Sequence, residues 1–211
     1  MSPLSQEKIH NLALRFKEAE WAWLNSLPDE TKAILSRSQE DGEFDPSLLT
    51  HYGAFFLTLL GIKPCFLIAN PDYPEFAIEF IENVMVAFMP ELKGFEIFRA
   101  AQYDNNSLVF VFTSRYHAKF HLIKELILTP RQQTGAPAEL LGKALGYPVP
   151  GGDDYVLSYV DDTTSKELGV TVVVFEYTAR MGFDMNIRMH FQKCASEFRK
   201  LGKVLSIVCQ H

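Results

Sequence analysis

The stretch FEIFRAAQYDNNSLVFVFT, residues 95–113, decides the fold that this sequence predicts. Its two arms, 95–103 and 108–113, are rich in aromatic and β-branched residues and flank Asp-Asn-Asn-Ser at 104–107. Asp, Asn and Ser favour turns because their short side chains hydrogen-bond to the nearby backbone. The pattern therefore predicts a β-hairpin, and with it at least one antiparallel sheet.

The residues before the hairpin predict one strand and one helix. A short apolar run at 65–69 has the length of a buried strand. After a turn at 70–74, a helix is predicted over 74–89 because its large apolar residues recur at helical spacing: Phe76, Phe80, Val84 and Phe88.

The residues after the hairpin predict helical structure and then another strand. Ser114 is a suitable N-cap for a helix that extends to Leu128, and helical signals continue up to Gly146. Residues 155–160 alternate between apolar and polar and predict a strand. From 65 to 160 the order of elements is that of a split β-α-β, ferredoxin-like unit.

The C-terminal part predicts a strand at 170–177, a helix at 184–201 and a final strand at 204–209, with a polar connection at 161–169. This strand–helix–strand would extend the sheet. The predicted fold class is therefore α+β, with N-terminal helices followed by a ferredoxin-like mixed sheet.

The N-terminal third predicts helices alone. One helix is expected over 3–25, a second over 29–36 and a third between 45 and 61. We therefore divide the chain into a helical N-terminal part, 1–63, and an α+β sheet domain, 64–211, within one compact unit.

Composition argues against several classes of partner. The 211 residues carry a net charge of −6 and no dense Lys/Arg run, so a nucleic-acid partner is not expected. The N-terminus lacks signal-peptide features, and no apolar run approaches the roughly 18–20 residues of a membrane span. Three cysteines without metal-type spacing fit a reducing compartment, so a cytoplasmic location is expected.

The segment 114–154 carries the predicted ligand-binding residues. Arg131 lies near a predicted helix start, where free N–H groups and the guanidinium could together bind an anion, although ordinary capping is the alternative interpretation. Arg115, Thr134 and Tyr147 of the same segment complete the predicted set. No Walker-type glycine pattern or GxGxxG is present, so the sequence identifies no cofactor.

Three residues are candidates for acid–base catalysis. His117 and His121 are four apart on a predicted helix and would share one face. A metal would need a further ligand that this helix does not supply, so no metal site is predicted. Glu176 interrupts an apolar strand and would become a candidate base if helices cover its face, with Arg99 as a partner across the sheet.

Two functions remain open from the sequence. The first is a domain that binds a small anionic ligand on the 114–154 side, with an enzymatic role undecided. The alternative is a non-catalytic protein–protein or homo-oligomeric module that uses the N-terminal helices. Trp21 and Trp23 favour the alternative, because residues two apart project about 200° from each other on a helix, so one should be less buried.

Overall fold

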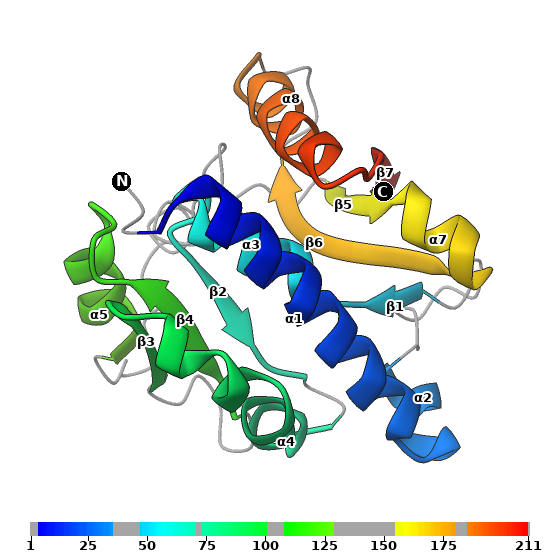
Figure 1. Ribbon diagram of the computed structural model, residues 1–211, viewed down its shortest axis with the longest axis horizontal. Helices are drawn as coiled ribbons and strands as arrows, with labels where there is room; N and C mark the ends of the chain where they lie inside the picture. Colours follow the sequence, from blue (N-terminus) through cyan, green and yellow to red (C-terminus); the bar gives the residue numbers. More distant parts are fainter. Residues whose placement is uncertain are drawn as a thin grey trace.

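The chain combines helices and strands in a computed structural model, which confirms the predicted α+β class (Figure 1). The strands form two separate sheets instead of one. The structure describes these residues: 4–35, 47–70, 73–100, 108–128, 155–179 and 185–210.

The helical elements are α1 (Gln6–Ser26), α2 (Asp29–Leu35), α3 (Tyr52–Leu59), α4 (Phe76–Asn83), α5 (Phe120–Leu128), α7 (Asp162–Leu168) and α8 (Met185–Lys200), with short 3-10 turns η1 (Met85–Ala87) and η2 (Met89–Glu91). The strands are β1 (Ser47–Leu49), β2 (Cys65–Ile68), β3 (Phe95–Arg99), β4 (Phe110–Ser114), β5 (Tyr155–Asp161), β6 (Thr171–Ala179) and β7 (Leu205–Gln210). Among the described helices, none combines the length and apolarity needed to cross a bilayer.

The smaller sheet contains the predicted hairpin. Its strand order is β2-β4-β3, with both pairs antiparallel. Phe95 pairs with Ser114 and Arg99 with Phe110, which confirms the pairing expected from residues 95–113. The larger sheet has the order β1-β6-β5-β7, in which β1 runs parallel to β6 and the other pairs are antiparallel.

The prediction of one continuous sheet was wrong for the described strands. The strand at 155–160 was expected in the same ferredoxin-like sheet as the hairpin, but β5 pairs with β6 and β7 in the other sheet. The reason is chain connectivity, since α7 joins β5 to β6 within a few residues. Pairing such neighbours closes a short loop, which loses less conformational entropy than pairing across the chain.

A second difference is that the polar connection at 161–169 contains a helix. Asp161 caps α7, because its carboxylate accepts from the Thr164 amide at 2.9 Å and from the Thr164 hydroxyl at 2.6 Å. Gly169 ends the helix with a φ of 69°. The hydroxyl of Tyr52 also donates to Asp161, and this contact links α3 to the larger sheet.

The N-terminal part was predicted to contain helices alone, and this prediction was wrong. Residues 47–49 form β1, and α3 begins only at Tyr52. The backbone here is extended because it pairs with β6, and the amide of Thr50 continues that pairing by donating to the Val173 carbonyl at 2.9 Å. At the other end, α1 begins after Ser5, whose hydroxyl accepts from the Lys8 amide at 3.3 Å.

Helix α3 is the centre of the molecule. All eight of its residues are buried, as expected for a helix that is apolar on every side. It lies between the two sheets with α1 running across it (Figure 1), and it contacts α1, β2, β4 and β6. Gly53 permits close approach to β6, because a Cβ there would lie 2.5 Å from the Cβ of Val174.

A buried helix must satisfy its first backbone N–H groups from inside the protein. Glu20 of α1 does this for α3. Its carboxylate is 1% exposed and accepts from the amide of His51 at 2.6 Å and from that of Tyr52 at 3.0 Å. The negative charge also complements the positive end of the α3 dipole.

We expect Glu20→Gln to lower the free energy of unfolding by about 1–3 kcal/mol, because one amide donor would then face the side-chain NH₂ instead of an oxygen. Urea unfolding would measure the change. Glu18→Gln, an exposed position on the same helix, is the control and should alter stability by less than about 0.5 kcal/mol. Equal effects of the two substitutions would contradict this role for Glu20.

Candidate functional site

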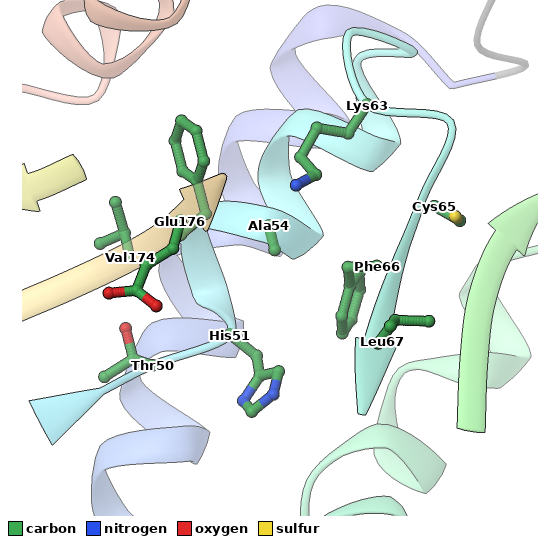
Figure 2. Close-up of a pocket in the computed structure, with 10 residues that line it drawn as sticks. Thr50, His51, Ala54, Lys63, Cys65, Phe66, Leu67, Val174 and Glu176 are labelled. Atoms are coloured by element: carbon green, nitrogen blue, oxygen red, sulfur yellow. The ribbon is translucent and has the colours of Figure 1, made fainter. Parts of the chain in front are cut away.

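A cavity of about 150 Å³ lies between β6 of the larger sheet and β2 of the smaller sheet, beside α3 (Figure 2). Most of its wall is apolar, with Ala54, Phe66, Leu67, Val174 and Phe175. The polar side chains that line it are those of Thr50, His51, Lys63 and Glu176. An apolar pocket with a few polar groups is the usual form of a small-molecule site.

The end of α3 places Lys63 in this wall. Gly61 adopts a φ of 71°, a left-handed conformation that reverses the chain after the helix. The amides of Ile62 and Lys63 then donate to the carbonyl of Leu57, at 2.9 and 3.1 Å. Lys63 is thereby held between the end of α3 and the beginning of β2, with its side chain extending toward β6 (Figure 2).

The environment of the Lys63 amine is mainly apolar. The residue is 9% exposed, and its Nζ stands 5.3 Å from the centre of the Phe175 ring. Burial lowers the pKa of Lys63 from its ordinary value of 10.5, because the ammonium form loses its hydration. A larger share of this lysine is therefore neutral at a given pH than of an exposed lysine.

Nearby titratable groups do not reverse this effect. Burial raises the pKa of the Cys65 thiol and of the Cys194 thiol to about 12, so neither supplies a negative charge at neutral pH. Burial, together with the charge of Lys63, lowers the pKa of His190 to about 4. The Cys194 sulfur lies 3.6 Å from Nε2 of this neutral histidine.

Two buried polar atoms at the beginning of α3 lack hydrogen bonds. The hydroxyl of Thr50, a residue 2% exposed, has no hydrogen-bond partner among the described residues. Nδ1 of His51 lies 3.4 Å from Oε1 of Glu20 but makes no hydrogen bond to it. Leaving such a group unsatisfied costs about 1–3 kcal/mol, so both atoms lower the stability of the folded protein.

Glu176 is the predicted catalytic residue that lies at this cavity. Its side chain is exposed, and one carboxylate oxygen accepts from the hydroxyl of Ser158 on β5 at 2.6 Å. The expected pairing with Arg99 was wrong, because Arg99 belongs to β3 in the other sheet. Glu176 lines the cavity from β6, but its exposure means that the covered face on which its predicted role as a base depended is absent.

The predicted pair of histidines does not share a helix. Helix α5 begins at Phe120, so His117 lies in the preceding turn, where its Nδ1 accepts from the Lys119 amide at 3.1 Å. Burial lowers the pKa of His117. His121 is exposed in the first turn of α5. Within the described part of the chain, no three His, Cys, Asp or Glu side chains are arranged to hold a metal.

Of the two arginines predicted to bind the ligand, the structure describes Arg115, which lies at the surface. Arg115 forms an ion pair with Glu96, and its side chain is 62% exposed. Lys124 lies 3.5 Å from the other carboxylate oxygen of Glu96. The remaining predicted residues, Arg131, Thr134 and Tyr147, lie outside the described residues.

The two tryptophans differ in burial, as predicted. Trp23 is buried and packs against Phe76 and Phe80, with ring centres 5.4 and 5.5 Å away. Trp21 is partly buried and contacts the same core. Both rings thus contribute to the fold.

The sequence contained one signal for the cavity that our prediction missed. Lys63 is a lone charge in the apolar run LLGIKPCFLIA, residues 59–69, directly before a buried strand. A charged residue in such a run is costly to bury unless it has a structural or functional role. Thr50 and His51 offered no comparable signal, since their burial depends on the packing of α1 and both sheets.

Comparisons of the chain with models of protein families, with curated proteins and with solved structures find no match.

We expect Lys63→Met to raise the free energy of unfolding at pH 7 by about 1–3 kcal/mol, because it removes a buried amine that must be desolvated. The gain should shrink as the pH approaches 10.5. The pKa of Lys63 is lower in the folded state than in the unfolded state. At pH values between these two pKa values the unfolded state therefore binds more protons, so the free energy of unfolding of the wild type falls as the pH falls through this range.

Urea unfolding at several pH values would measure this difference. Lys8→Met is the matched control, because the Lys8 side chain is 42% exposed, and it should change stability by less than about 0.5 kcal/mol. A Lys63→Met protein that is less stable than the wild type at every pH would contradict the account.

Proposed function

We propose that this protein binds a small organic anion with a short apolar tail in the cavity between β2 and β6. One observation carries the proposal: the largely apolar wall of this cavity contains the amine of Lys63, together with the polar side chains of Thr50, His51 and Glu176. The proposed ligand is still the small anion expected from the sequence, but its proposed site is this cavity and not the 114–154 side.

The volume limits the ligand to a small molecule. Apolar cavities of about 150 Å³ hold benzene, so a ligand of about six non-hydrogen atoms is the right size. The best very small ligands gain about 1.5 kcal/mol per atom, which sets a ceiling of about 9 kcal/mol and a dissociation constant no tighter than roughly sub-micromolar.

The chemistry of the wall favours a carboxylate. A carboxylate oxygen would accept from the Lys63 ammonium in a charge-assisted hydrogen bond. The apolar tail would pack against Phe66 and Val174, and this burial contributes roughly 25 cal/mol per Å². The negative charge of such a ligand would stabilise the ammonium form of Lys63, which burial destabilises.

The alternative function, an interaction through the N-terminal helices, has less support. Trp23 is packed into the core and Trp21 is half-buried against it, so their rings contribute little open apolar area. Interaction sites of this kind present a contiguous exposed apolar patch.

Isobutyrate, titrated by isothermal calorimetry, is a suitable probe of the proposed site. We expect binding to weaken as the pH rises above the lowered pKa of Lys63, by up to about tenfold per pH unit, because the carboxylate requires the ammonium form. Lys63→Met should weaken binding at least about tenfold, since it removes a charge-assisted hydrogen bond.

Isobutyramide is the matched ligand control, because it has the same shape without the charge and should bind much more weakly. Lys8→Met, at the exposed lysine, should bind isobutyrate like the wild type. The proposed function would be overturned if isobutyrate and isobutyramide bound with equal affinity and if Lys63→Met left that affinity unchanged.

A further inference from the structure

We propose that Lys63 forms a covalent imine with a small aliphatic aldehyde that enters the cavity between β2 and β6. The inference rests on the proposed function, because it uses the same cavity. It goes further by naming a second class of ligand and a chemical step.

The placement of the amine suits a carbonyl compound. The Lys63 nitrogen lies in a wall that also contains Phe66, Val174 and Phe175, so an alkyl tail would be buried while the carbonyl carbon meets the amine.

The surroundings favour the nucleophilic form of the amine. Burial lowers the pKa of Lys63, and a desolvated lysine in an apolar pocket is the type that forms Schiff bases. The thiols whose charge would act on it, Cys65 of β2 and Cys194 of α8, would oppose this only as thiolates, and burial raises the pKa of each to about 12. His190 of α8, with its pKa lowered to about 4, is neutral as well.

The step balances without an oxidant or reductant. The nitrogen lone pair forms a C–N bond to the aldehyde carbon while the C=O π electrons move to oxygen. A proton passes from nitrogen to that oxygen and gives a carbinolamine. The hydroxyl then leaves with a further proton as water, and a C=N bond forms. Glu176 lines the same cavity from β6 and is the group that would transfer these protons.

Reductive trapping of the wild-type protein tests the inference directly. The protein is incubated with isobutyraldehyde and sodium cyanoborohydride at pH 7.5, and the rate of alkylation at each lysine is followed by peptide mass spectrometry. We expect Lys63 to be labelled faster than the exposed Lys8, because the lowered pKa of Lys63 leaves a larger fraction of its amine neutral at this pH.

Two controls separate this reactivity from general lysine chemistry. Isobutyrate should slow labelling of Lys63 and leave Lys8 unaffected. Lys63→Arg, which retains a cation without a nucleophilic amine, should lose the fast adduct in the intact mass spectrum, whereas Lys8→Arg should retain it.

Labelling of Lys63 no faster than of Lys8 would overturn the imine. If isobutyrate still binds in a Lys63-dependent manner, only this inference fails and the proposed function stands. If neither the adduct nor Lys63-dependent isobutyrate binding is found, both fail.

Discussion

The complete burial of α3 is the constraint on which the rest of the structure depends. A helix with no solvent-facing side needs packing partners all round, and α1 and the two sheets supply them. Its first amides must be satisfied internally, and the buried carboxylate of Glu20 satisfies two of them. The residues at either end of α3 are consequently drawn into the interior, and these include Thr50, His51 and Lys63.

The same burial that holds the fold together creates the chemistry of the cavity. An exposed lysine or threonine would be hydrated, and neither would discriminate between ligands. Placed between β2 and β6, Lys63 has a lowered pKa and Thr50 an unsatisfied hydroxyl. The desolvated amine and the unsatisfied hydroxyl each destabilise the folded state by an amount on the order of 1–3 kcal/mol. A ligand with complementary charge would recover part of that free energy. The stability cost and the proposed binding site are thus two consequences of one arrangement.

Local patterns in the sequence predicted the elements better than their assembly. The hairpin at 95–113 and the helices α1 and α8 followed from turn chemistry and periodicity, because these signals act over a few residues. The division into two sheets depends on which distant strands pair, and the switch of 47–49 from helix to strand depends on β6. The site was harder still: Glu176 was predicted and lines the cavity, whereas Lys63 was missed because its burial arises from contacts between the α3–β2 connection and β6.

The desolvation of the Lys63 amine and the proposed binding of an anion beside it can be tested together. The most direct measurement is the titration of Lys63 by ¹³C NMR at its Cε, assigned by comparison with Lys63→Arg, without and with isobutyrate. The account predicts a midpoint below the ordinary 10.5 that moves upward when isobutyrate binds. A Lys63 signal that titrates together with the exposed lysines and does not respond to isobutyrate would contradict it.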